Sequence, residues 1–292
     1  MRGRDPLLMA LRQLTSRDRR LLELLYDHKV LTTDQIADAL FPNLDTAQHR
    51  LVKLTGFDVV DRSRPLREGG GSYHYRYTIG RLGAEYVAAL RGEDPPRADR
   101  LTQQRRRLLT SPTLEHTLGA NGFFVALLRH ARHHPESALT RWWSPEQCSR
   151  FGAFGLTVLA AVMPDGHGIW ADRDRAAAFF LEHDTGSESL TRLADKLARY
   201  DEFVRRGGPP HPVLFWLHSS AREHRLHAKL SQVRPIVPVA TAARDQRASN
   251  DPAGAVWSLH GGSGRRLRLA QLPAVASPAP PVHRADRVGL RG

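Results

Sequence analysis

In residues 16–90, the sequence patterns of three short amphipathic helices are followed by two β-rich runs joined by a glycine-rich loop, and then by a fourth helical pattern. Leucines give the stretch 16–27 an apolar face, which predicts the first helix. Thr32 with Gln35 has the spacing of a capping box and predicts the start of the second helix. Asp45, with a glutamine three positions later, predicts the start of the third in the same way.

The two β-rich runs, Val59–Arg62 and Tyr73–Ile79, flank a loop that is basic and rich in glycine. A further helix is predicted from Leu82 to Leu90. This order is typical of a winged helix-turn-helix, in which the third helix can enter the major groove and the wing can reach phosphates or the minor groove. We therefore predict a DNA-binding domain over residues 10–90.

The candidate DNA contacts are polar residues that face away from the predicted core of this domain. On the third helix, Ala47, Leu51 and Leu54 share the buried face. The outward candidates are Thr46, His49, Arg50 and Lys53 on the helix, and Arg62, Arg64 and Arg67 on the wing. The chain has 43 basic and 30 acidic residues, a net charge of +13, which favours double-stranded DNA as the partner. Because some winged helices bind proteins instead, that alternative stays open.

Several classes of protein are excluded by composition. The single cysteine, Cys148, excludes an intrachain disulfide and a multi-cysteine metal site, and it is compatible with a reducing compartment. The N-terminus is polar and charged through Asp5, and no apolar run approaches the length of a membrane span. We expect a cytoplasmic protein with no membrane partner.

The rest of the chain is predicted to form a linker, a second domain and a tail. Residues 91–112 contain helix-breaking prolines and three consecutive arginines, as expected for a linker. Residues 271–292 are rich in proline and alanine, so we expect them to be disordered. Residues 113–270 read αβββαβαβ, an α/β layer architecture, so the whole chain is α+β. The strands are predicted at Gly155–Met163, Gly168–Ala171, Ala176–Glu182, Val213–His218 and Ile236–Ala240.

Carboxylates occupy two ends of the predicted strands. Asp165 precedes one strand, and Glu182 and Asp184 end the next. This arrangement resembles the PD-(D/E)xK, or restriction-endonuclease-like, fold, in which an Asp and a Glu hold a divalent metal and a Lys two residues later positions water. The resemblance implies Mg²⁺ or Mn²⁺ on Asp165, Glu182 and Asp184. Asp184 occupies the position of that lysine, so Lys196 on the next helix is the candidate replacement. A structural remnant of the fold, without catalysis, is the alternative.

Further segments carry a resemblance to a known family. They are Leu114-Glu115-His116, Trp142-Trp143, Pro164-Asp165-Gly166, and Phe180–Ser189 with Lys196 and Tyr200. Together with the winged-helix pattern, they resemble the replication-relaxation family over about residues 10–240. The resemblance implies a role in plasmid or integrative-element replication and DNA relaxation, with other replication or mobilisation proteins as further partners.

Two function classes follow from these patterns. The first is a DNA-binding replication protein whose second domain is a metal-dependent nuclease or nicking module. The second is a non-catalytic DNA-binding regulator that uses the nuclease-like domain for assembly.

Overall fold

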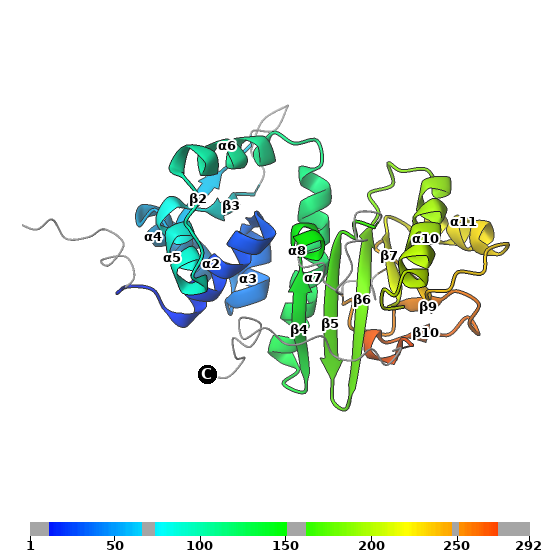
Figure 1. The fold of residues 1–292 in the computed structure, drawn as a ribbon. Coiled ribbons are helices and arrows are strands. Elements are labelled where there is room, and N and C mark those ends of the chain that lie inside the picture. Colours follow the sequence, from blue (N-terminus) through cyan, green and yellow to red (C-terminus); the bar gives the residue numbers. More distant parts are fainter. Residues whose placement is uncertain (1–11, 66–73, 151–161, 247–250, 274–292) are drawn as a thin grey trace, which may run out of the picture. The chain divides into compact units, whose positions relative to one another are not determined.

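The computed structural model describes residues 12–65, 74–150, 162–246 and 251–273, and contains helices and two β-sheets (Figure 1). The chain is therefore a mixed α/β protein. It divides into two compact units, Met1–Val125 and Ala126–Gly292.

The first unit contains most of the helices and a three-stranded sheet with the order β1-β3-β2. Both pairs of neighbouring strands are antiparallel. The elements are α2 (Ser16–His28), β1 (Leu31–Thr32), α3 (Thr33–Leu40), α4 (Leu44–Gly56), β2 (Val60–Ser63), β3 (Arg76–Ile79), α5 (Arg81–Arg91), α6 (Ala98–Leu109) and the start of α7 (Leu114–His133).

Local capping sets the helix starts in this unit. The capping box predicted at Thr32 and Gln35 is present at the start of α3. The third helix starts differently, because the side chain of Asn43, and not of Asp45, accepts the hydrogen bond from the amide of Thr46. Asp45 lies in the first turn of α4, where its negative charge interacts favourably with the helix dipole.

The predicted hairpin forms from β2 and β3, and α5 packs closely beside it. A Cβ atom on Gly83 of α5 would lie 2.1 Å from the carbonyl oxygen of Val59, so only glycine allows this approach. Arg67 and Tyr73, which the sequence places on the wing, lie outside the described residues.

The stretch 91–112, predicted as a linker from its helix-breaking prolines, contains the twelve-residue helix α6. Two contacts within the unit hold this helix. Arg105 pairs with Asp61 of β2, and Leu108 packs on the buried cluster formed by Val30, Leu114 and Leu118. The start of α7 thus belongs to the core of the first unit, and the division between the units falls inside α7.

The second unit is built on a seven-stranded sheet with the order β10-β9-β8-β7-β6-β5-β4. Strands β6, β7 and β8 are parallel, and the other neighbours are antiparallel. The elements after α7 are β4 (Ser137–Trp143), α8 (Pro145–Arg150), β5 (Gly166–Asp172), β6 (Arg175–His183), α10 (Leu190–Arg205), β7 (Val213–Leu217), α11 (Ser220–Leu230), β8 (Val239–Ala243), β9 (Trp257–Leu259), β10 (Arg266–Leu267) and the 3₁₀ helix η3 (Leu269–Gln271).

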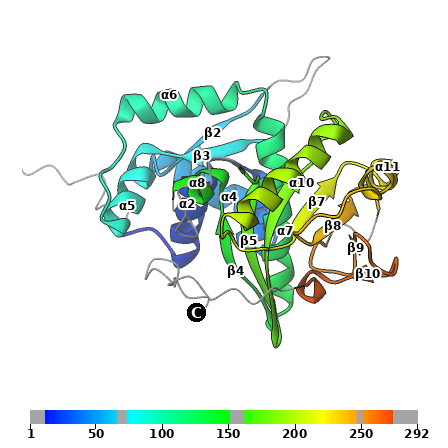
Figure 2. The same cartoon turned by 45° about the vertical axis from the view of Figure 1, so that its right-hand side comes forward.

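Helices lie on both faces of this sheet (Figure 2). On one face, α10 and α11 bury leucines against Phe180 of β6 and Phe215 of β7. On the other face, His130 near the end of α7 contacts the ring of Trp170 in β5 edge-on. Successive strand residues point to opposite faces, so Glu182, two residues after Phe180, also points toward α10.

Strand β4 was not predicted from the sequence. It pairs with β5 at the edge of the sheet, runs from Ser137 to Trp143 and contains the Trp142-Trp143 pair. The strand predicted at Gly155–Met163 lies mostly outside the described residues, and its last two residues are not in a strand. The β-bulge between Leu139 and Arg141 interrupts the alternating pattern that would have identified β4.

Candidate functional site

A buried carboxylate lies at the end of β6. Glu182 is 3% exposed, and both of its oxygens have donors. The hydroxyl of Tyr200 donates to Oε1 at 2.7 Å, and the ammonium group of Lys196 donates to Oε2 at 2.8 Å. Lys196 and Tyr200 are four residues apart on α10, so one face of the helix presents both to the strand.

Two more carboxylates belong to the surroundings of Glu182. Asp165, just before β5, accepts a hydrogen bond from the amide of His183 at 2.7 Å, which fixes it beside the end of β6. Glu188 lies 3.0 Å from the ammonium group of Lys196. The lysine thus bridges Glu182 and Glu188.

The proximity of Asp165 changes the acidity of Glu182. Burial and the negative charge of Asp165 raise the pKa of Glu182 to about 7, against the opposing effect of Lys196 and Tyr200. Burial lowers the pKa of Lys196, but the negative charges of Glu182 and Asp165 outweigh burial and raise it. The cluster therefore contains a carboxyl group that can change its protonation state near neutral pH.

Asp184 does not join this cluster. Its two oxygens accept hydrogen bonds from Nε and Nη2 of Arg222, at 2.5 and 2.8 Å, and both side chains are buried. Arg222 also donates to the carbonyl of Glu188, and Arg244 donates to the carbonyl of Asp184 at 2.7 Å. Asp165, Glu182 and Asp184 therefore do not form a common metal site, and Arg222 neutralises the charge of Asp184.

In the described part of the chain, no three His, Cys, Asp or Glu side chains gather in an arrangement that could hold a metal ion. Asp165 and Glu182 remain as a pair of neighbouring carboxylates with Lys196 beside them. Sequence analysis did not assign roles to Tyr200, Glu188 or Arg222. The four-residue spacing of Lys196 and Tyr200 is the signal that could have linked both to Glu182.

The predicted DNA contacts on α4 divide into two groups. Thr46, His49 and Lys53 are exposed. Leu44 and Val52 on the same helix are 41% and 54% exposed, so the outer surface of α4 combines polar and apolar side chains.

Arg50 is held within the fold. Its Nε and Nη2 donate to the two oxygens of Asp18 at 3.0 and 2.6 Å, and Nη2 also donates to the carbonyl of Gln13. Asp18 is 1% exposed and also belongs to the capping box of α2 with Thr15. We therefore correct the prediction for Arg50: it pairs with a buried carboxylate and does not project outward to read bases.

Two arginines of the hairpin share one aromatic ring. The guanidinium carbons of Arg62 and Arg64 each lie 4.8 Å from the ring centre of Tyr75. Both arginines are exposed. Stacking of this kind restricts a long side chain while it leaves the charge accessible.

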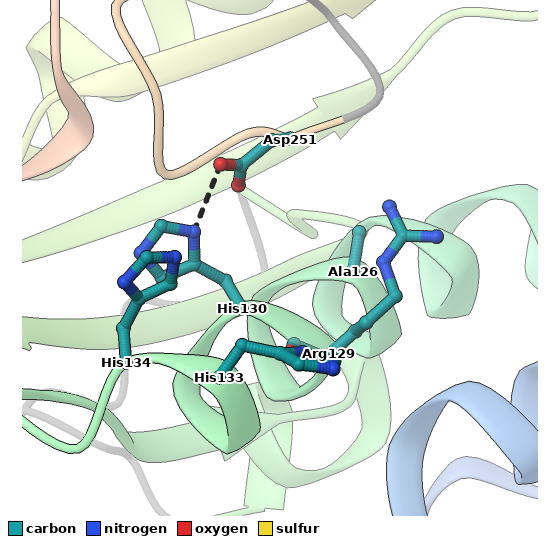
Figure 3. A pocket seen from close by; sticks show the side chains of 6 residues that line it. All are labelled: Ala126, Arg129, His130, His133, His134 and Asp251. Atoms are coloured by element: carbon teal, nitrogen blue, oxygen red, sulfur yellow. Dashed lines mark hydrogen bonds and ion pairs between the residues drawn. The ribbon is translucent and has the colours of Figure 1, made fainter. Parts of the chain in front are cut away.

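A second candidate site, on the second unit, is a pocket of about 230 Å³ (Figure 3). Nδ1 of His130 lies 2.8 Å from a carboxylate oxygen of Asp251, and the rings of His130 and His134 are stacked with their centres 4.1 Å apart. Nδ1 of His133 lies 2.8 Å from the carbonyl of Arg129. These contacts use Nδ1 of His130 and of His133, and among the described residues the pocket does not bring together three His, Cys, Asp or Glu side chains that could hold a metal ion. The lining residues are Ala126, Arg129, His130, His133, His134 and Asp251.

No helix among the described residues is both long and apolar enough to cross a membrane.

Comparison with known proteins assigns the family. The sequence profile described as replication-relaxation matches residues 22–213, about two thirds of the chain. The chain belongs to the replication-relaxation family. The matched region of this family member includes Asp165, Glu182, Lys196 and Tyr200, whereas Arg222 lies beyond it.

Other comparisons add little to the family assignment. No curated protein gives a significant match. Among solved structures, the family member is similar to a protein titled "Possible transcriptional regulator" from Methanosarcina mazei Go1. The two are 23% identical, the match covers 37% of this chain and 88% of the other, and the TM-score is 0.23. A TM-score this low does not establish a shared fold.

Proposed function

We propose that this replication-relaxation protein binds double-stranded DNA through its first unit during replication or mobilisation of a plasmid or other mobile element. The family supports the biological setting. The observation that carries the DNA-binding proposal is the exposed surface of α4 together with the stacked pair Arg62 and Arg64.

The order of elements supports a winged helix-turn-helix in the first unit. In this proposal, α4 is the helix that enters the major groove, and the β2–β3 hairpin is the wing. Thr46, His49 and Lys53 would reach base edges or phosphates, while the exposed Leu44 and Val52 offer apolar contacts of the kind that thymine methyl groups accept. Arg62 and Arg64 would contact phosphates or the minor groove.

Binding of the full chain to random-sequence duplexes at increasing salt tests this proposal. Each phosphate contact contributes about −0.9 to the slope of log affinity against log salt. We expect a steep negative slope. Failure of the full chain to bind any duplex at low salt would reject DNA binding.

A second candidate function is metal-dependent cleavage of one DNA strand by the second unit. It is favoured by the proximity of Asp165, Glu182 and Lys196, the residue types of the PD-(D/E)xK resemblance. Mg²⁺ is commonly bound by one or two carboxylates together with waters and substrate phosphates. An ionised carboxylate has about four acceptor positions, so the two donors on Glu182 leave room for a cation.

The donor chemistry of Asp165 and Glu182 therefore fits Mg²⁺ or Mn²⁺. When bound, such an ion would neutralise charge that develops on a scissile phosphate. Lys196 would orient a water molecule or a phosphate oxygen, and Tyr200 would keep the Glu182 carboxylate in place. Asp184 would act indirectly, because its pairing with Arg222 fixes the chain just after β6.

A supercoiled-plasmid assay with Mg²⁺ or Mn²⁺ separates this candidate from a non-catalytic assembly domain. We expect open circles from the wild type and none from Glu182→Gln, with Asp174→Asn, an exposed acid on the β5–β6 turn, as the matched control. Absence of nicking by the wild type, with DNA binding intact, would favour the assembly domain.

A further inference from the structure

Helix α6 exposes a basic face that the functions proposed above do not use. None of its residues is buried. Arg100 and Arg107 are seven residues apart and so lie on one face, with Gln103 and Gln104 between them. Arg106 is exposed on the flank of this face. We call Arg100, Gln103, Gln104, Arg106 and Arg107 the outer face of α6.

The opposite face attaches α6 to the rest of the first unit. Arg105 pairs with Asp61 of β2, and Leu108 packs on the cluster that contains Val30. Figures 1 and 2 both show α6 lying beside β2. Asp61 precedes Arg62 in β2, so the anchor of α6 adjoins a residue of the proposed wing.

The arginines of the outer face have no acidic partner among the described residues. Arg100, Arg106 and Arg107 form no ion pair with another described residue, whereas Arg105 on the inner face does. Arg106 and Arg107 lie in the last turn of α6, where positive charge interacts favourably with the helix dipole. Arg100 lies in the first turn, where positive charge is unfavourable, and binding of a polyanion would offset that cost.

We propose that the outer face of α6 is a second DNA-contacting surface, which binds backbone phosphates beside the duplex segment held by α4 and the wing. This inference rests on the proposed DNA binding of the first unit. Duplex DNA is favoured over an acidic protein because the anchor of α6 adjoins Arg62 in β2. The side chains are arginine and glutamine, which donate to phosphates without reading sequence.

The test compares salt slopes of full-length variants on one duplex. In Arg100→Gln with Arg107→Gln, we expect the slope to become less steep by about 2, because the variant cannot neutralise two of the phosphates. Binding should weaken equally for all duplex sequences. Glutamine has a helix propensity close to that of arginine, so α6 should persist. Replacement of the same two residues by lysine should keep the slope.

The matched control is Arg173→Gln with Arg175→Gln, which removes the same charge from two exposed positions, one in the β5–β6 turn and one at the start of β6. This variant should keep the wild-type slope. An unchanged slope in the α6 variant, or an equal change in the control, would overturn the role of α6 while DNA binding stands. Failure of the wild type to bind duplex DNA would overturn both proposals, and binding of an acidic protein by α6 in its place would then be the finding.

Discussion

The ammonium group of Lys196 lies 2.8 Å from Oε2 of Glu182, although the two residues belong to a helix and a strand fourteen positions apart. The strand position two residues after Glu182 holds Asp184, so no lysine reaches the carboxylate from β6 itself. Instead, Lys196 on α10 donates to the carboxylate of Glu182. In the proposed nicking function, Lys196 takes the place of the strand lysine that the PD-(D/E)xK resemblance implies.

The first prediction concerns the pH dependence that Glu182 gives to folding. Its pKa is about 7 in the folded protein, against 4.5 for an ordinary glutamate. Between these values the folded state holds a proton that the unfolded state has released. The stabilisation is therefore complete below pH 4.5 and is lost as the pH rises through 7. The loss should be on the order of 3 kcal/mol, because each pKa unit between the folded and unfolded values corresponds to about 1.4 kcal/mol.

Glu182→Gln should remove this dependence. Relative to the wild type, the variant should gain free energy of unfolding as the pH rises from 5 to 8, measured by urea denaturation. The difference between the two proteins is the useful quantity, because burial lowers the pKa of His211 to about 4 and gives an opposite trend at lower pH in both. A difference that stays constant across this range would contradict the raised pKa of Glu182.

The second prediction concerns divalent cations. If Asp165 and Glu182 bind Mg²⁺ or Mn²⁺ in the folded state only, the ion should raise the thermal midpoint in a concentration-dependent way. An ion concentration one hundred times the dissociation constant adds about 2.7 kcal/mol. Asp165→Asn and Glu182→Gln should abolish the increase. Asp184→Asn should keep it, because Arg222 and not the cation neutralises Asp184.

The control for the cation experiment is Asp174→Asn, which removes an exposed carboxylate from the β5–β6 turn. It should respond to the ion as the wild type does. Equal increases in all variants would mean that the cations bind elsewhere, and the metal proposal for Asp165 and Glu182 would fail.

The features predicted correctly from the sequence are those set by near neighbours. The capping box at Thr32 and Gln35 involves residues three positions apart, and the structure contains it. Contacts between distant residues were not visible. Asp18 and Arg50 are 32 positions apart, and Asp61 and Arg105 are 44 apart. The helical periodicity of α4 therefore placed Arg50 on the solvent side, as a residue free to contact DNA.

The same limit applies to α6 and to the candidate metal site. Nearby prolines and three successive arginines suggested a linker, because the contacts that hold α6 come from Asp61 and Val30. At the end of β6, the alternating pattern placed Glu182 and Asp184 on one face. It could not show that Asp184 forms an ion pair with Arg222 of α11. Partner choice among buried charges depends on tertiary structure.

The third prediction is that Asp184 and Arg222 form a structural pair. Asp184→Ala should leave the Arg222 guanidinium buried without its counter-charge, and removal of one partner from a buried pair typically costs about 3–5 kcal/mol. The exposed pair Glu202 and Arg206 is the comparison, and Glu202→Ala should change the free energy of unfolding far less, because solvent screens that pair. Urea denaturation measures both. Equal small losses would show that the Asp184–Arg222 pair contributes little to folding.

The fourth prediction separates Arg50 from Lys53, which both belong to α4. Arg50→Ala should destabilise the fold, by about 2 kcal/mol, because Asp18 is buried and loses hydrogen bonds from a charged donor. Lys53 is exposed, so Lys53→Ala should leave stability unchanged and weaken DNA binding or alter its sequence preference. A good hydrogen-bonded pairing between a side chain and a base contributes about 1–3 kcal/mol of discrimination at that base.

Lys229→Ala, which removes an exposed lysine from α11, is the charge-matched control and should change neither stability nor sequence preference. Urea denaturation and competition among randomised duplexes measure the two effects. If Arg50→Ala kept full stability but changed sequence preference, its pairing with Asp18 would not persist in the DNA-bound protein, and Arg50 would return to the DNA-contacting surface.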